Sequence, residues 1–308
     1  MKDDFVRAMI RETARDPRIM LISGDLGFGA LEPYEEKFPS NFLNVGVAEQ
    51  NMIGVAAGLA KTGRIPFVYS IANFPTFRCL EQIRIDVCYH ELPVNIVSVG
   101  AGLSYGTLGY THHSIEDISV MRSMPGMRIF SPSNAEDVED SVKLMVDSPS
   151  PSYIRLAKSG TTSRGQVTSG SLKPIRLLKE GGRALVITTG EISAEIAEWA
   201  TDSRGFFGQC AVASLQVIKP MNLGDLIEDF DAIVTVEEHS LAGGLGSAVL
   251  EFMRDKGIVK PILGLGLSDS VSHEVGSQSY LRTLAGIDAT TLEIQIGNFA
   301  KEHGLTFV

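Results

Sequence analysis

Glu49 is the residue best placed for proton transfer. It follows the apolar run FLNVGV and opens EQNMIGVAAGLAKTG, a stretch of small and apolar residues that predicts a helix. A glutamate in the first turn of a helix complements the helix dipole, and this is the structural interpretation. The apolar neighbours also predict partial burial, which favours the protonated form of a carboxylate and lets it exchange protons.

A second candidate is His112, which comes before His113 at the end of the glycine-rich segment VGAGLSYGTLGYTHHSIED. Most single histidines have structural roles. An imidazole that ends a permissive loop and precedes two acidic residues is also suited to catalysis, because it titrates near neutral pH. The residues alone support both roles about equally.

Aromatic and basic side chains occur together in NFPTFRCLEQIRIDV. Phe74 and Phe77 have the spacing of residues that pack in a core, but either ring could also stack on a flat heterocycle. Arg78 is either a partner in a surface ion pair or a group that binds a ligand.

The elements that must position these residues alternate between short apolar runs and amphipathic stretches. IMLIS (residues 19–23), PFVYSI, VNIVSVG, MRIFSP and SYIRLA are typical of buried parallel strands, and the segments between them of helices. The same alternation starts again after a polar segment. We therefore expect an α/β fold with two parallel-sheet, three-layer domains, residues 1–160 and 175–308, joined by a linker at 161–174.

Composition excludes several classes of function. The chain has 308 residues and a formal net charge of −10, which disfavours binding to nucleic acid or to an anionic membrane. No apolar run approaches the ~20 residues that span a bilayer, so we expect a cytoplasmic protein. Phosphate-loop, dinucleotide-binding, zinc-protease and serine-hydrolase motifs are absent.

Five segments together resemble the C-terminal portion of transketolases, in that family's order and spacing. They are SGDLGFG, NVGVAEQNMIGVAAGLA, YSIANFPTFRCLEQIR, GTLGYTHHSIED and PSYIRLAKSG, and VTVEEHSLAGGLGSAVLE resembles the family's C-terminal domain. The resemblance covers essentially the whole chain. It implies a pyrimidine-binding domain followed by a transketolase C-terminal domain, with thiamine diphosphate as the cofactor.

The family's diphosphate-binding motif, G-D-G with a later Asn, is missing from this sequence. The resemblance therefore implies a split enzyme, whose diphosphate-binding domain and Mg²⁺ belong to a large partner subunit. It implies a heterotetramer of two large and two small subunits that transfers a two-carbon ketol unit between sugar-type substrates in carbohydrate metabolism. No metal ligand is expected in this chain.

The resemblance also implies roles for individual residues. Glu49 hydrogen-bonds N1′ of the aminopyrimidine, and His112 contacts substrate oxygens near the reacting carbon. Phe74 stacks on the pyrimidine, with Phe77 as second choice. Asp25 and Leu26 match positions that line the cofactor pocket. The further substrate-binding candidates are Arg78 and Lys158.

Three positions depart from the family pattern. Leu108 stands where the sugar enzymes carry an Asp that faces substrate hydroxyls, and Gly100 replaces a His that helps to hold the substrate phosphate. Lys158 replaces an Arg, and a lysine cannot form a bidentate fork with phosphate. These changes predict a modified substrate, such as an unusual sugar or 2-oxo compound.

Three alternatives stay open. The beta subunit of a 2-oxo-acid dehydrogenase, or a synthase that decarboxylates pyruvate, has the same fold and the same glutamate, although the Thr111–His112 segment favours transketolase. A non-catalytic scaffold subunit would not need Glu49 and His112. A stand-alone binding module would function without a partner.

Overall fold

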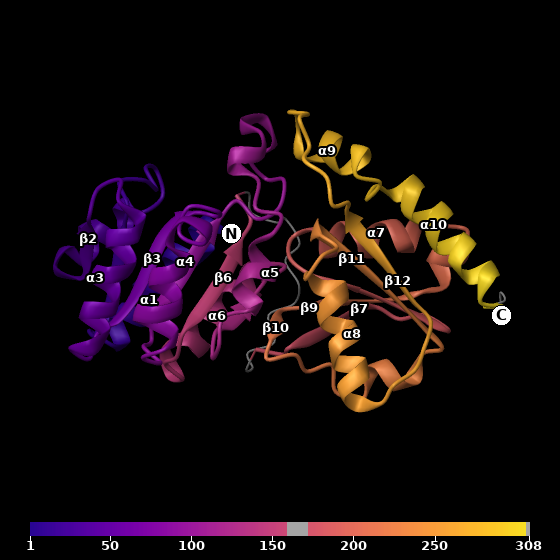
Figure 1. Cartoon of the computed structure of the whole chain (residues 1–308), viewed down its shortest axis with the longest axis horizontal. Helices are drawn as coiled ribbons and strands as arrows, with labels where there is room; N and C mark the ends of the chain where they lie inside the picture. The colour runs from indigo at the N-terminus through magenta and orange to yellow at the C-terminus, as the bar shows by residue number, and fades with distance from the viewer. Residues whose placement is uncertain (159–171, 306–308) are drawn as a thin grey trace.

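The first of two sheets in the computed structural model, which describes residues 1–158 and 172–305, has the strand order β10-β5-β6-β4-β3-β1-β2 (Figure 1). Its strands are β1 Ile19–Ser23, β2 Phe42–Asn44, β3 Ile65–Ile71, β4 Asn95–Val99, β5 Arg128–Phe130, β6 Ser152–Leu156 and β10 Val217–Lys219. Neighbouring strands are parallel except β10, which pairs antiparallel with β5.

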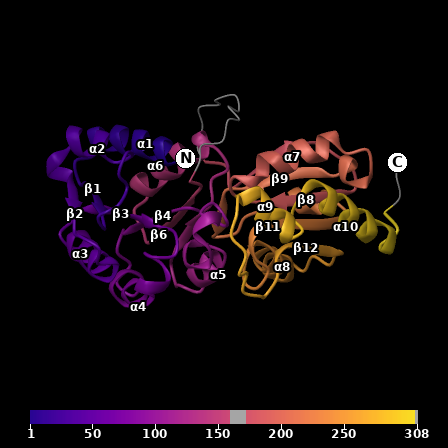
Figure 2. The ribbon, with the colours of Figure 1, turned by 90° about the horizontal axis from the view of Figure 1, so that it is seen from above.

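Helices cover both faces of this sheet. They are α1 Lys2–Arg15, α2 Glu32–Lys37, α3 Glu49–Lys61, α4 Leu80–Gln82, α5 Asp117–Arg122 and α6 Ala135–Asp147. Figure 2 shows α1, α2 and α6 on one face and α3, α4 and α5 on the other. Single turns connect the elements: η1 Pro39–Asn41, η2 Phe77–Cys79, η4 Gly106–Leu108, η5 Tyr110–His112 and the π-helical η3 Ile83–Cys88.

The second sheet has the order β12-β11-β8-β9-β7 and is parallel except for the edge strand β7. Its strands are β7 Ile175–Lys179, β8 Ala184–Thr188, β9 Ala211–Leu215, β11 Ala232–Ser240 and β12 Ile262–Leu267. Its helices are α7 Ile192–Asp202, α8 Leu245–Lys256, α9 Gln278–Leu284 and α10 Ala289–Glu302, with η6 Phe206–Gln209 and η7 Leu226–Asp229. The expected α/β fold with two mostly parallel sheets is confirmed.

The local patterns explain why these elements form. Strands β1, β4, β6, β8 and β9 are buried along their whole length, as continuous apolar runs predict for central parallel strands. Helix α6 begins after Asn134, whose side-chain oxygen accepts the N–H of Asp137 at 2.9 Å. This cap satisfies one of the backbone donors that a helix start leaves free.

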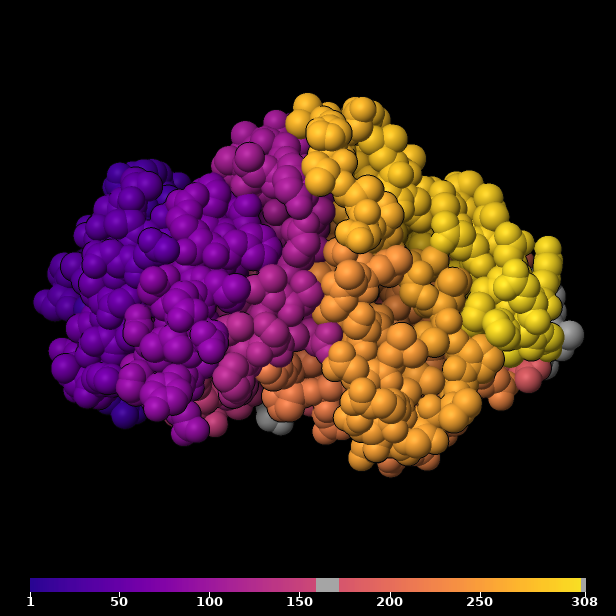
Figure 3. All heavy atoms as spheres, viewed as in Figure 1, coloured from indigo at the N-terminus to yellow at the C-terminus, as the bar shows by residue number. Residues whose placement is uncertain are grey.

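The two halves of the chain share an apolar core. One continuous cluster runs from Ile22 and Met52 in the first half to Leu185 and Val249 in the second. In Figure 3 the surfaces of the two halves meet along a continuous boundary. The described part of the predicted linker is residues 172–174, and 161–171 lie outside the described residues. Among the helices of the described chain, none is long and apolar enough to cross a membrane.

His239, at the end of β11, lies in the contact between the halves and is fully buried. Its Nδ1 is 2.7 Å from the carbonyl of Ser240, and the N–H of Ile118 donates to its Nε2 at 3.1 Å. These partners fit a neutral ring with the proton on Nδ1. Burial lowers the pKa of His239 to about 4, and the Asp117 carboxylate only partly opposes this shift.

We expect the free energy of unfolding to fall as the pH drops from 6.5 towards 4. In that window the unfolded chain binds a proton at His239 that the folded chain excludes. The loss at pH 5.5 should be about 1.4 kcal/mol relative to pH 7.5. His239→Gln keeps a donor and an acceptor but does not titrate, so it should lack this contribution in urea unfolding at the two pH values. An identical pH dependence in both proteins would contradict the assignment.

Candidate active site

The candidate residues follow the carboxyl ends of adjacent parallel strands. Asp25 comes after β1, Glu49 after β2, Phe74 after β3, His112 after β4 and Lys158 after β6. These strands are consecutive in the order β6-β4-β3-β1-β2. The carboxyl edge of an open parallel sheet is where α/β proteins bind their ligands, so the topology brings the candidates to one edge.

Glu49 is the first residue of α3 and is 3% exposed. Its Oε2 accepts a hydrogen bond of 2.8 Å from Nη1 of Arg78, whose side chain is half-exposed. No other hydrogen bond joins this carboxylate to a described side chain, so one oxygen is free to accept a further donor. Gln50 Nε2 donates to the carbonyl of Arg78 at 3.0 Å and thereby ties the arginine to α3.

Aromatic rings extend this ion pair into a row of contacts. The guanidinium of Arg78 lies 4.6 Å from the ring centroid of Phe74, and the Phe74 and His112 rings are 5.3 Å apart at 65°. Tyr105 follows, with its ring 6.3 Å from that of His112, and the Lys158 ammonium lies 4.9 Å from the Tyr105 ring. Sequence reasoning missed Tyr105, although it belongs to the glycine-rich segment already singled out.

A cavity of about 590 Å³ opens beside this row. It is lined by Asn73, Phe74, Phe77, Arg78, Tyr110, Thr111, His113 and Glu116. Its size is in the range of small-molecule sites, which combine apolar walls with a few polar groups. Asn73 Nδ2 donates to the Thr111 carbonyl at 2.6 Å, which joins the loops after β3 and β4. The predicted Phe77 and Arg78 thus line a cavity next to Glu49.

Two groups in the cavity were not chosen from the sequence as site residues. His113 is 1% exposed, and burial lowers its pKa, so it is neutral at physiological pH. Glu116 accepts a hydrogen bond of 2.8 Å from the Tyr110 hydroxyl, and burial raises the pKa of Glu116. Both occur in the THHSIED stretch that ends the glycine-rich segment.

Asp25 and Leu26 lie at the same sheet edge but outside the row of contacts. The Asp25 N–H donates to Oδ1 of Asn44 at 3.0 Å, and Asn44 Nδ2 donates back to Asp25 Oδ1 at 3.0 Å. Within the described chain, no hydrogen bond, ion pair or ring contact joins Asp25 or Leu26 to Glu49, Arg78 or Phe74. Their role in a cofactor pocket therefore stays a prediction.

Cysteine chemistry is disfavoured at this site. Cys79 follows Arg78 and is buried and free. Burial raises the pKa of the Cys79 thiol to about 12, and the nearby Glu49 carboxylate adds to this shift. The thiolate, which is the nucleophilic form, is therefore scarce at neutral pH.

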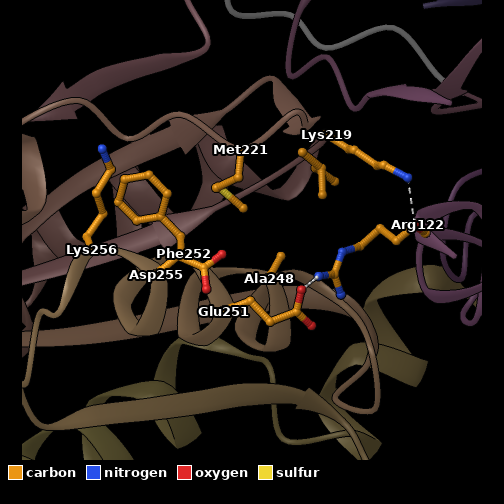
Figure 4. A pocket seen from close by; sticks show the side chains of 9 residues that line it. Arg122, Lys219, Met221, Ala248, Glu251, Phe252, Asp255 and Lys256 are labelled. Carbon is orange, nitrogen blue, oxygen red and sulfur yellow. Dashed lines mark hydrogen bonds and ion pairs between the residues drawn. The ribbon is translucent and has the colours of Figure 1, made fainter. Parts of the chain in front are cut away.

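A second cavity, of about 290 Å³, lies between the halves of the chain and is lined by residues of α5, β10 and α8 (Figure 4). Three of its charged groups, Arg122, Lys219 and Glu251, already have partners. Arg122 pairs with Glu251 at 2.6 Å, and the Lys219 ammonium donates to the Arg122 carbonyl at 2.8 Å. This cavity contains none of the candidate residues at the strand ends.

Comparisons with known proteins agree with this geometry. Residues 1–163 match the family model "Transketolase, pyrimidine binding domain", and residues 174–292 match "Transketolase, C-terminal domain". An apulose-4-phosphate transketolase subunit of Phocaeicola vulgatus is 32% identical over 301 residues, which cover 95% of this chain and 96% of that protein.

Two further relatives are similar over nearly their full length. The 6-deoxy-6-sulfo-D-fructose transketolase subunit SqwH of Clostridium sp. is 32% identical over 297 residues, covering 94% of this chain and 91% of that protein. A solved structure described as "Split gene transketolase, inactive beta4 tetramer" has a TM-score of 0.83 and 31% identity, and the match covers 96% of each chain.

The buried ion pair predicts a measurable coupling. Arg78→Met leaves the buried Glu49 carboxylate without a partner, so it should lower the free energy of unfolding of the isolated chain by about 1–2 kcal/mol. Adding Glu49→Gln should restore most of this loss in urea denaturation, because the group left behind is then neutral. Arg84→Met, which breaks an exposed pair with Glu81, is the matched control. Equal losses in the single and double variants would contradict the coupling.

Proposed function

Because this chain belongs to the transketolase family, we propose that it supplies the pyrimidine-binding half of a split, thiamine diphosphate-dependent transketolase. The Glu49–Arg78–Phe74–His112 row beside the 590 Å³ cavity carries this proposal. The reaction moves a two-carbon ketol unit from a ketose donor to an aldehyde acceptor and leaves an aldose two carbons shorter.

The residues at the sheet edge fit an aminopyrimidine. A flat ring needs an apolar face, which Phe74 offers, with Phe77 as the alternative. A ring nitrogen needs a proton-exchanging partner, and Glu49 is buried with one oxygen free. When bound, the cofactor supplies a nucleophilic carbon and an electron sink. In this chain Glu49 holds or accepts the proton at the ring nitrogen, and Asp25 and Leu26 complete the wall of the pocket.

His112 contributes on the substrate side. It lies between Phe74 and Tyr105, and its Nδ1 is 2.9 Å from the Thr111 hydroxyl. We assign it to the substrate oxygens next to the reacting carbon, where a fixed donor stabilises developing negative charge. Arg78 is half-exposed at the cavity and is assigned to substrate contact.

We further propose that the substrate is a sugar derivative other than the common pentose phosphates, and that it has an anionic end group. A Cβ on Gly100, at φ 98°, would lie 2.1 Å from Tyr105 Cε2, so the Tyr105 ring fills the space of any side chain there. Leu108 is 51% exposed and offers no hydrogen bond from its side chain. Lys158 forms no ion pair with a described carboxylate, which leaves its charge available to an anion. The relatives named above act on a phosphorylated sugar and a sulfonated sugar.

The remaining assignments concern the assembly. We propose a large partner subunit that carries the diphosphate-binding domain and Mg²⁺, in a heterotetramer of two large and two small subunits. We place the complex in the cytoplasm. We also retain residues 1–160 and 175–308 as the two domains, with the linker at 161–174 between them.

Glu49→Gln tests the catalytic half of the proposal. In the complex reconstituted with the partner subunit, kcat should fall by about 10²–10⁴-fold, because proton exchange at the ring nitrogen is lost. Gel filtration should show the same assembly as for the wild type. Glu81→Gln, an exposed glutamate in the next helical segment, is the control and should be fully active. Unchanged activity of Glu49→Gln would favour a scaffold subunit, whereas release of CO₂ from pyruvate would favour a decarboxylating synthase.

Lys158→Met tests the substrate half. For a phosphorylated or sulfonated ketose, KM should rise about 10–100-fold, because a charged contact is lost. For hydroxypyruvate, whose only charge is the carboxylate next to the reacting carbonyl and which has no phosphate or sulfonate at a distant end, KM should stay within about twofold. If KM rose equally for both substrates, Lys158 would not be the residue that binds the anionic end group. Efficient turnover of xylulose 5-phosphate with ribose 5-phosphate by the wild-type complex would contradict the modified substrate.

A further inference from the structure

The loop that carries His112 leaves the first sheet after β4 and is closed at its base. Gly102 and Ser114 exchange two backbone hydrogen bonds of 3.0 and 2.9 Å. Residues 103–113 therefore form an excursion that ends next to the active site. Figure 1 shows its short helices beside the segment that leads into α9 of the second half, and the Gly276 N–H donates to the Gly106 carbonyl at 3.2 Å.

A buried carboxylate from the second half holds the first residue of this excursion. Glu238, on β11, is 5% exposed, and its Oε1 accepts the N–H of Leu103 at 2.5 Å. The backbone approaches so closely that a Cβ on Gly102, at φ 60°, would lie 2.5 Å from the same oxygen. The fit between loop and carboxylate thus leaves no room for a side chain.

The carboxylate is itself fixed by α9. Gln278 Nε2 donates to both of its oxygens, at 2.9 and 3.2 Å, and Arg282 forms a buried ion pair with it. The same Gln278 amide reaches Glu191 at 2.5 Å, and Glu191 accepts the Ser104 hydroxyl of the loop at 3.1 Å. Two consecutive loop residues, Leu103 and Ser104, are therefore held by one polar network of the second half.

The end of the excursion is held in a similar way. The guanidinium of Arg155 donates to the Ser114 carbonyl at 2.7 Å and to the Glu238 carbonyl at 2.9 Å. The Ser240 N–H donates to the Ile115 carbonyl at 2.7 Å. Both ends of the His112 loop are thus anchored on β11, while its tip meets the first half through the bond from Asn73 to Thr111.

We propose that Glu238 is a positioning residue, which fixes the His112 loop on the C-terminal domain and so sets His112 against Phe74 and Glu49. This inference rests on the proposed function only for the role of His112. A displacement of about 1 Å at a catalytic group can cost 10²-fold in rate. The cofactor side of the site does not depend on this anchor, because Glu49 and Phe74 follow β2 and β3.

Glu238→Gln tests the anchor at nearly constant side-chain volume. The amide has one acceptor oxygen in place of two, so it cannot accept hydrogen bonds from Leu103, Gln278 and Arg282 together. In the reconstituted complex, kcat/KM for hydroxypyruvate should fall about 10–100-fold. Affinity for thiamine diphosphate should change by less than about twofold. In the isolated chain, amide hydrogen exchange should accelerate at least about tenfold in residues 100–116 but not in 42–61.

Glu237→Gln is the matched control. Glu237 is the preceding residue and is buried, but it accepts from the N–H groups of Leu245 and Gly246 within the second half. The Glu237→Gln variant should keep wild-type rates of amide hydrogen exchange in residues 100–116 and a wild-type kcat/KM per folded complex. Gln278→Ala, a partly exposed change on α9, should reproduce the Glu238→Gln pattern more weakly, and it decides the question if Glu238→Gln does not fold.

Unchanged loop exchange and kcat/KM in folded Glu238→Gln would overturn the proposal. The proposal would also be overturned if the loss of kcat/KM in Glu238→Gln were explained by weaker cofactor binding or by a smaller folded fraction, since either result indicates a general structural role. If the wild-type complex does not convert hydroxypyruvate, the proposed function fails, and the exchange experiment still decides whether Glu238 anchors the loop.

Discussion

The buried carboxylate of Glu49 is held by one guanidinium, and the candidate site depends on this ion pair. Taking a carboxylate out of water costs several kcal/mol, and Arg78 offsets the cost with a 2.8 Å bond from a half-exposed position. The same guanidinium lies on the ring of Phe74, whose other neighbour is His112. This arrangement uses one oxygen of the carboxylate for the arginine and leaves the other without a partner in the described chain, which suits exchange of a proton with a ligand.

The residues of the candidate site are positioned in two different ways. Glu49 and Phe74 follow strands of the first sheet, and parallel pairing alone brings them to one edge. His112 sits on a loop that Glu238 of the second half holds at its start. Arg155 of the first half links the end of the loop to the same strand, because it donates to the carbonyls of Ser114 and Glu238. The shared apolar core holds the two halves in a fixed relative position. The C-terminal domain is therefore part of the site's construction and not an appendage.

Local patterns predicted the features that depend on local burial. The run IMLIS is β1 with the expected bounds, and Glu49 begins α3 at a strand-to-helix boundary as expected. Features that depend on contacts between distant segments were not visible. Strand β10 crosses to the first sheet although its three residues carry no periodicity, and Glu238 reads as one acidic residue of a strand until Leu103 is placed against it. Tyr105 is meaningful only once its ring is seen to fill the space at Gly100.

Isothermal titration calorimetry tests most directly the claim that this chain holds half of a cofactor site. Thiamine diphosphate, in the presence of Mg²⁺, is titrated separately into the isolated chain, the partner subunit and their complex. Binding should be tight only in the complex, because the residues of this chain offer the pyrimidine a ring and a carboxylate but carry no diphosphate motif. Submicromolar binding by the isolated chain would contradict the account.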